Sequence, residues 1–329
     1  MRFAIGKLTM SIHVTQPGFS HRYLNLAEMR RLQHQFFASR KVVEGLYAGR
    51  HTSPQRGHSV EFVDYRQYQP GDEFGDIDWK VYGRTDKLMI RMFEHQSDMT
   101  VHLVLDASAS MSFAGMASSS TEDGNSKSSS MGPHKSKYDL ACQMAGAIAF
   151  LTTKQQDKIS LAIAQQGLKS FNRPAGSFSN MNNLLDVMEQ TQLSGESNLP
   201  EALQQFSSLV KQRGLVIVFS DLLDDMEATL RRLDAITHRG CEVILFHVMH
   251  EDELQSPSGP DAIFVDSETS EKLPVNVADV RIAYKKRMQQ FLAAWVSACK
   301  GRNIDYKLVS TAMPYHEAIA NYLFSRSRM

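Results

Sequence analysis

The chain has 329 residues, which is long enough for one large domain or two medium ones with a sizeable buried core. Its 36 basic and 36 acidic side chains balance, so the composition excludes a general electrostatic attraction to nucleic acid or to an anionic membrane. No run approaches the roughly 18 apolar residues of a membrane span, and the start lacks the continuous apolar segment of a signal peptide. A cytoplasmic protein with no membrane span and no nucleic-acid partner is therefore expected.

Two segments precede the regular part of the chain. Residues 1–23 show no periodic pattern and are predicted to be disordered. Apolar side chains recur at helical spacing over residues 24–47, and short strand-like runs flank a Pro-Gly-Asp turn at residues 70–72. Residues 24–98 are therefore expected to form N-terminal helices and a small β element, in which Trp79 is a packed core anchor.

From residue 99 to residue 326, apolar strands and helices alternate. Strands are predicted over residues 101–106, 159–165, 215–221, 241–248 and 304–310, a hairpin over 262–275, and helices over 137–155, 181–190, 199–212, 226–240, 280–303 and 314–326. Continuous apolar strands separated by helices are typical of a sheet that is covered on both faces. The fold class is thus predicted to be α/β, with a doubly wound, mostly parallel sheet.

One insertion interrupts this domain. Residues 112–136 are rich in serine and nearly free of large apolar side chains. Such a composition cannot bury enough apolar surface to order itself, so a flexible insertion is expected there.

The most informative stretch is DASASM, which directly follows the apolar run VHLVLD. In an extended loop, residues i, i+2 and i+4 point the same way, so Asp106, Ser108 and Ser110 present one carboxylate and two hydroxyls to one point. In doubly wound sheets, ligands bind beyond the carboxyl ends of the strands, which is where this loop leaves the sheet.

Two further oxygen-bearing side chains are expected at the same edge. Asp221 ends the strand-like run LVIVFSD, and Ser197 lies in a glycine-containing loop just before a predicted helix. Carboxylates and hydroxyls are hard oxygen donors, which suit magnesium and do not suit zinc.

This constellation resembles the metal-ion-dependent adhesion site of von Willebrand factor A domains, where DxSxS follows the first strand, a Thr or Ser lies in a later loop, and an Asp follows a later strand. The resemblance implies a von Willebrand A (Rossmann-like) fold and coordination of Mg²⁺, or another divalent cation, by Asp106, Ser108, Ser110, Ser197 and Asp221. It also implies a protein partner whose acidic side chain completes the coordination shell. Ser197 departs from the usual threonine but keeps the hydroxyl.

Residues 43–94 carry a second resemblance. They contain HTSPQRGHSVEF, YQPGDEFGDIDW and GRTDKL, and are similar to the GxHxSPxxGxSxEFxxxRxYxPGDxxRxIDWxxxxRxxxL signature of the bacterial "domain of unknown function 58" family. The similarity extends over roughly residues 24–326, although Gly75 stands where the family usually has arginine. The family implies a MoxR-type AAA+ ATPase as the partner, and a chaperone-like role in the maturation or assembly of other proteins.

Two alternatives to a metal-dependent interaction module remain open. A magnesium-dependent aspartyl phosphatase or phosphotransferase would use Asp106 as a nucleophile, but such haloacid-dehalogenase-like enzymes carry DxD, and the second acidic position here is Ser108. The chain has no GxxxxGK[ST] or GxGxxG loop, and no His or Lys adjoins DASASM or FSD in sequence, so a protein without enzymatic activity is expected. The other alternative is an interaction scaffold of the same fold that binds no metal.

Overall fold

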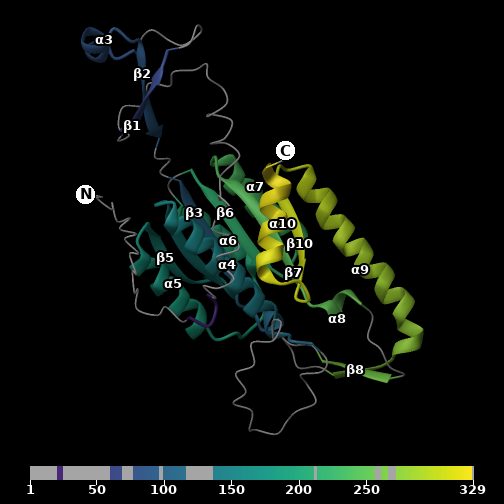
Figure 1. Cartoon of the computed structure of the whole chain (residues 1–329). Helices are drawn as coiled ribbons and strands as arrows, with labels where there is room; N and C mark the ends of the chain where they lie inside the picture. The colour runs from purple at the N-terminus through teal and green to yellow at the C-terminus, as the bar shows by residue number, and fades with distance from the viewer. Residues whose placement is uncertain are drawn as a thin grey trace, which may run out of the picture.

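The computed structural model describes residues 21–24, 60–68, 77–95, 99–115, 136–210, 213–255, 261–265 and 272–327 (Figure 1). The predicted helices of residues 24–47, apart from Leu24, and residues 116–135 of the predicted flexible insertion lie outside the described residues.

The centre of the molecule is a six-stranded sheet. In spatial order its strands are β10 (Asp305–Ser310), β7 (Glu242–Met249), β6 (Leu215–Ser220), β3 (Thr100–Asp106), β4 (Lys158–Ala164) and β5 (Leu168–Ala175). All neighbours pair in parallel except β4 and β5, which are antiparallel. The predicted mostly parallel α/β sheet is therefore confirmed.

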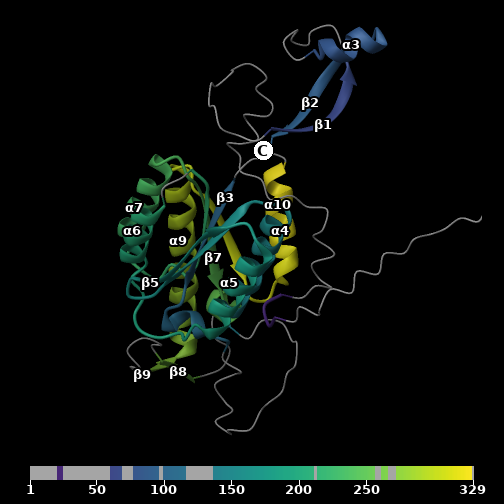
Figure 2. The ribbon, with the colours of Figure 1, turned by 90° about the vertical axis from the view of Figure 1, so that its left-hand side faces the viewer.

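Helices cover both faces of this sheet, as Figure 2 shows from the side. One face carries α4 (Lys137–Lys154), α5 (Phe178–Gln190) and α10 (Tyr315–Ser327), and the other carries α6 (Leu199–Leu209), α7 (Met226–His238) and α9 (Val277–Lys300). The central strand β3 serves both layers, because Leu103 and Leu105 belong to the first core cluster and Val104 to the second. Burial on both faces explains why this strand is mostly apolar and buried along its whole length.

The strand order places a topological switch point at β3. The chain passes from β3 to β4 and β5 on one side, and then returns to pair β6 on the other side of β3. Ligand sites of open α/β sheets lie beyond the carboxyl ends of strands at such a point. Asp106 and Asp221, at the ends of β3 and β6, are therefore brought to the same edge of the sheet.

The edge strand β5 was not anticipated from the sequence. Its residues LKSFNRPA are only half-buried and include Pro174, which cannot donate a ladder hydrogen bond. Proline is tolerated there because the strand has a neighbour on one side only, β4. The antiparallel edge also makes the segment polar, so it lacks the apolar run by which the buried strands were recognised.

The segment before the sheet consists of β1 (Val60–Gln67), α3 (Trp79–Thr85) and β2 (Met89–His95), with β1 and β2 forming an antiparallel pair as expected. The helix is new: the Asp78 carboxylate accepts hydrogen bonds from the backbone of Lys80 and Val81, which caps its first turn. The prediction that Trp79 is a packed core anchor is wrong. Its side chain is 59% exposed, whereas Ile77 is 1% exposed.

Residues 21–24 pack against the first helical layer. Tyr23 is buried in the first core cluster, its hydroxyl donates to the Asp139 carboxylate at 3.2 Å, and the Arg22 guanidinium pairs with the same carboxylate at 2.9 Å. The predicted disordered segment, residues 1–23, therefore extends too far at its C-terminal end, and residues 1–20 lie outside the described part of the chain.

A hairpin and a short helix lie at the periphery of the domain. Strands β8 (Asp261–Val265) and β9 (Lys272–Asn276) form the expected antiparallel hairpin, next to the short helix α8 (Glu251–Leu254). The thiols of Cys142, Cys241 and Cys299 are buried and form no disulfide. Among the helices that the structure describes, none combines the length and the apolar character needed to cross a bilayer.

The buried histidine of β3 predicts a dependence of stability on pH. His102 is 3% exposed, its Nδ1 lies 2.6 Å from Ser160 Oγ, and burial lowers its pKa from 6.5 to about 4. Between these pH values the unfolded chain binds a proton that the folded chain does not, so acidification from pH 6.5 to 4 removes up to about 3 kcal/mol of stability. Urea denaturation at several pH values is expected to show a shallower acid loss in His102→Asn than in the wild type, and equal slopes would contradict this assignment.

Candidate functional site

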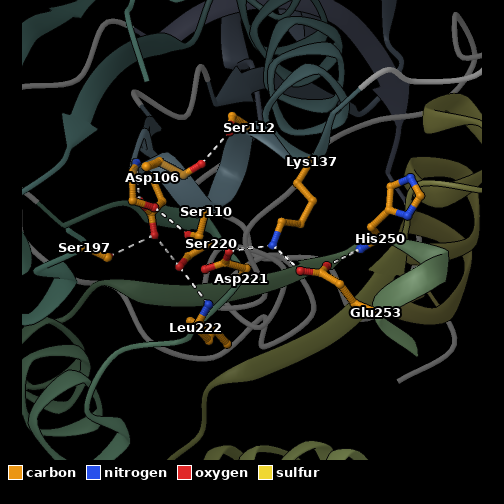
Figure 3. Close-up of polar contacts among 12 residues, drawn as sticks. Asp106, Ser110, Ser112, Lys137, Ser197, Ser220, Asp221, Leu222, His250 and Glu253 are labelled. Carbon is orange, nitrogen blue, oxygen red and sulfur yellow. Dashed lines mark hydrogen bonds and ion pairs between the residues drawn. The ribbon is translucent and has the colours of Figure 1, made fainter. Parts of the chain in front are cut away.

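The loops that follow β3 and β6 form the candidate site, shown in Figure 3. Asp106 is the last residue of β3, and Ser108 precedes the single 3₁₀ turn η2 (Ala109–Ser112). On the neighbouring strand, Ser220 ends β6 and Asp221 follows it. Aspartate and serine are ordinarily found on a protein surface, but Asp106, Ser108, Ser220 and Asp221 are each at most 1% exposed.

Asp106 is held through both of its carboxylate oxygens. Oδ1 accepts a hydrogen bond of 3.0 Å from the backbone N–H of Ser108, and Oδ2 accepts one of 2.7 Å from the Ser220 hydroxyl. Burial, followed by the nearby negative charge of Asp221, raises the pKa of Asp106 from 3.8 to about 7. A positive charge in the site would offset both effects.

The predicted serines join the same network. Ser108 Oγ and Ser110 Oγ lie 3.1 Å apart, and the Ser197 hydroxyl lies 3.4 Å from Asp106 Oδ2. The stronger contact of Ser197 is a donated hydrogen bond of 2.5 Å to Asp224 Oδ2. The fold thus brings together the predicted residues Asp106, Ser108 and Ser110 and the sequence-distant Ser197.

Asp221 lies between this network and a buried lysine (Figure 3). Lys137 Nζ is 2.7 Å from Asp221 Oδ2 and 2.8 Å from Glu253 Oε1, and the Lys137 side chain is 1% exposed. Burial alone would lower the pKa of Lys137, but the carboxylates of Asp221 and Glu253 outweigh it and raise that pKa above its ordinary value of 10.5. A fixed cation therefore stands on one side of Asp221.

Four residues of the site were missed in the sequence. Ser220 and Asp224 left a signal, because Ser220 directly precedes the recognised Asp221, Asp224 follows it by three residues, and both carry side-chain oxygens near the same strand end. Lys137 and Glu253 left none, since each lies in a polar stretch that is typical of a solvated surface. The absence of a cation next to DASASM in sequence is thus overcome by the fold, which brings Lys137 in from the start of α4.

The residues present fit a hard divalent cation. Oδ1 of Asp221 is buried and accepts no hydrogen bond from the described residues, which is costly for a carboxylate oxygen unless something else satisfies it. In the described ranges, no three His, Cys, Asp or Glu side chains come together as a metal-binding group. An ion here would therefore depend on serine hydroxyls together with Asp106 and Asp221, a set of oxygen ligands that suits Mg²⁺.

A polar cavity of about 470 Å³ adjoins the site on the side of the β4–β5 turn. Its lining includes Gln166, Lys169 and Gly195. The carbonyl oxygen of Gly195 accepts a hydrogen bond of 3.1 Å from the backbone N–H of Ala109, so the cavity and the DASASM loop share a wall.

Two bacterial proteins are similar to parts of this chain. The chain is 26% identical over 234 residues to "Uncharacterized protein Rv1480" of Mycobacterium tuberculosis, which is 70% of this chain and 68% of that protein. A segment of 56 residues is 38% identical to "Uncharacterized protein YeaD" of Bacillus subtilis, covering 17% of this chain and 14% of that protein.

Among solved structures, the conserved hypothetical protein BatB from Bacteroides thetaiotaomicron shares 12% identity with a TM-score of 0.42, over 70% of this chain and all of that one (100%). The SpRpn10 VWA domain shares 10% identity with a TM-score of 0.37, over 68% of this chain and 94% of that domain.

The family described as "Protein of unknown function DUF58" matches residues 64–291. The six-stranded, mostly parallel sheet, with helices on both faces, is the fold expected for this family. Because the match spans well over half of the chain, the protein belongs to the DUF58 family.

Proposed function

We propose that this protein binds other proteins through a divalent cation, most favourably Mg²⁺, held at the carboxyl ends of β3 and β6. The protein ligands in this proposal are Asp106, Ser108, Ser110, Ser197 and Asp221. When bound, the ion supplies a positive centre with open coordination positions, one of which an acidic side chain of the partner takes.

The observation that carries the proposal is the unsatisfied oxygen of Asp221. Oδ1 is buried without a hydrogen bond from the described residues, beside a network in which Asp106, Ser108, Ser110 and Ser197 gather their side-chain oxygens. A divalent cation satisfies this oxygen and offsets the repulsion between Asp106 and Asp221.

The partner in this proposal is a MoxR-type AAA+ ATPase, and the role is chaperone-like maturation or assembly of other proteins in the cytoplasm. Support for the partner comes only from what the resemblance of residues 43–94 to the family signature implies. Support for a protein ligand comes from the site itself, since the adjoining polar cavity offers a partner more contact surface than the ion alone.

An enzymatic role of the aspartyl phosphatase kind has less support. Its nucleophile would be Asp106, which is buried and accepts hydrogen bonds at both carboxylate oxygens. The acid/base position is Ser108, whose hydroxyl contacts Ser110 and offers no carboxyl group. The described residues around Asp106 thus hold it in place without freeing an oxygen for attack.

One observation favours the second candidate, an interaction scaffold that binds no metal. Lys137 already supplies a positive charge to Asp221. Its Nζ contacts Oδ2, while Oδ1 has no hydrogen bond from the described residues. The lysine therefore satisfies only one of the two carboxylate oxygens. We therefore place the metal-dependent function first.

Calorimetric titration with Mg²⁺ is the experiment that tests the proposal. The wild type is expected to bind one ion, and Asp106→Asn to bind it at least about tenfold more weakly, because one of two carboxylate ligands is lost. The partner ATPase is expected to co-purify with the wild type from its own lysate in Mg²⁺ and not in EDTA.

Asp234→Asn provides the matched control. Asp234 is an aspartate of α7, outside the site, where it lies in a partly exposed ion pair with Arg302 at 3.0 Å. The control is expected to bind Mg²⁺ as the wild type does. A wild type that takes up no divalent ion, together with partner capture that EDTA leaves intact, would favour the metal-free scaffold.

A further inference from the structure

A lysine whose side chain is entirely buried stands beside the proposed cation site. Lys137 is the first residue of α4 and is 0% exposed. Lysine is almost never fully buried unless it is paired, because removing an ammonium group from water is costly. Here the ammonium meets two carboxylates, Asp221 at 2.7 Å and Glu253 at 2.8 Å, and its Nζ lies 6.0 Å from the centre of the Phe113 ring.

Glu253 is itself fixed, so it holds the ammonium in place. Its Oε2 accepts a hydrogen bond of 2.8 Å from the backbone N–H of His250, which closes a capping box at the start of α8. Its backbone carbonyl accepts a hydrogen bond of 2.8 Å from the Tyr284 hydroxyl of α9. With Oε2 occupied, Oε1 is the oxygen that faces Lys137. Helices α8 and α9 therefore fix Glu253, and Glu253 in turn fixes the position of Nζ.

The charges of the cluster leave room for a divalent ion. Lys137 and Glu253 cancel each other, so the cluster carries the two negative charges of Asp106 and Asp221. Nζ contacts Oδ2 of Asp221, while Oδ1 has no hydrogen bond from the described residues. The lysine therefore occupies one oxygen of Asp221 and leaves the other without a donor among the described residues.

We infer that Lys137 is a positioning residue of the cation site, a built-in counter-ion that holds Asp221 in place through Oδ2 and keeps Oδ1 available for the metal. The inference rests on the proposed function and deepens it. In the absence of a divalent ion the lysine stabilises Asp221, so the domain folds without metal. Because the ammonium also repels the ion, Mg²⁺ binds the wild type weakly and stabilises it less than it would stabilise a variant without the lysine.

Thermal unfolding of Lys137→Met in EDTA and in Mg²⁺ tests this role. The wild type is expected to unfold at nearly the same temperature in both buffers. Lys137→Met is expected to unfold about 10 °C lower in EDTA, because two buried carboxylates lose their counter-ion, and Mg²⁺ is expected to restore a large part of the loss. Lys137→Arg keeps the charge and is expected to restore metal-independent folding.

The double variant K137M/E253Q separates two explanations. It removes the extra negative charge that Lys137→Met leaves behind, so the cluster again carries two negative charges. If Asp221 needs a cation on Oδ2, the double variant still gains much more stability from Mg²⁺ than the wild type does. If its melting temperature is as indifferent to Mg²⁺ as that of the wild type, the inference is overturned.

A second measurement keeps the inference testable even if Lys137→Met does not fold in either buffer. Glu253→Gln leaves the ammonium uncompensated next to the site, so Mg²⁺ affinity in calorimetry is expected to fall at least about fivefold. The matched control is Glu251→Gln on the same helix, whose carboxylate contacts the Gln255 side chain and not Lys137. Equal affinity in both variants would falsify the inference.

The two hypotheses fail differently. If the wild type binds no divalent ion, the proposed function fails. The proposed function stands if the wild type binds Mg²⁺ with an affinity that depends on Asp106. The role of Lys137 is nevertheless lost if Mg²⁺ shifts the melting temperature of Lys137→Met only as it does that of the wild type, and if Glu253→Gln and Glu251→Gln have equal Mg²⁺ affinity.

Discussion

Asp221→Asn is expected to lower the free energy of unfolding by about 3 kcal/mol in the absence of metal, whereas Asp106→Asn leaves it equal to or above that of the wild type. The two aspartates are the same residue type at the ends of neighbouring strands, and both are buried. Their surroundings differ in charge. Asp221 contacts the buried ammonium of Lys137 at 2.7 Å, while Asp106 contacts only neutral donors.

The physical reason for the difference is the state that each substitution leaves behind. Without the charge of Asp221, the ammonium of Lys137 keeps Glu253 alone as a charged partner, and a buried charge that loses a partner is strongly destabilising. Without the charge of Asp106, a repulsion disappears, since burial and the charge of Asp221 raise the pKa of Asp106 to about 7. An asparagine carboxamide can still accept the hydrogen bond from the Ser108 backbone.

Urea denaturation in EDTA at pH 8 measures this contrast, because the Asp106 carboxylate of the wild type is ionised above its pKa of about 7. Both variants are expected to lose Mg²⁺ binding in calorimetry. Loss of Mg²⁺ binding would thus accompany loss of stability in Asp221→Asn and not in Asp106→Asn. If Asp106→Asn were destabilised as much as Asp221→Asn, Asp106 too would depend on a counter-charge, and Lys137 would not distinguish the two strand ends.

The buried part of the fold could be predicted from the sequence because burial leaves a strong pattern. Strands β3 and β6 lie inside the sheet, with helices over both faces, and their residues are apolar almost without interruption. The edge strand β5 and the helix α3 left weaker patterns. One is half-buried and contains Pro174, and the other depends on a cap by Asp78 within a stretch that resembles β structure.

The candidate site was predictable to the extent that spacing along one loop encodes it. Asp106, Ser108 and Ser110 alternate, and alternation fixes the side on which extended residues point. Lys137 could not be found in this way. Its neighbourhood is set by where α4 begins and by the position of Glu253, which is 116 residues further along the chain. A lysine in the first turn of a helix is ordinarily solvated, and only the assembled fold shows that this one is enclosed.

The aromatic residue Trp79 shows the opposite error. Large apolar side chains are most often buried, so the sequence favoured a core anchor. In the structure Trp79 and Tyr82 are both exposed on α3, with their rings 6.1 Å apart and nearly perpendicular. The core position of this segment belongs to Ile77 instead. The sequence thus identified the right segment and the wrong residue within it.

Phe206→Ala is expected to destabilise the protein by about 3–5 kcal/mol, because a fully buried phenyl ring is replaced by a cavity. Phe206 lies on α6 within the second core cluster. Its ring packs edge to face against His102 of β3, at 5.7 Å, and against Phe171 of β5, at 6.0 Å. The ring therefore joins the helix to a central and to an edge strand, and the site has little room to collapse.

The same helix begins next to the proposed ligand Ser197, so the substitution also tests how independent the cation site is of the core. The Asp224 carboxylate accepts hydrogen bonds of 2.5 Å from the Ser197 hydroxyl and 2.9 Å from the backbone N–H of Leu199. These bonds hold the start of α6 without help from Phe206, so Mg²⁺ affinity is expected to be unchanged while the denaturation midpoint falls.

Phe178→Ala is the matched control, because that ring is 50% exposed on α5 and its truncation is expected to cost about 1 kcal/mol or less. A parallel loss of stability and of Mg²⁺ binding in Phe206→Ala would show that Asp224 does not fix Ser197 by itself. The packing of α6 against β3 would then be a part of the cation site, and substitutions in the second core cluster would alter partner binding as well as folding.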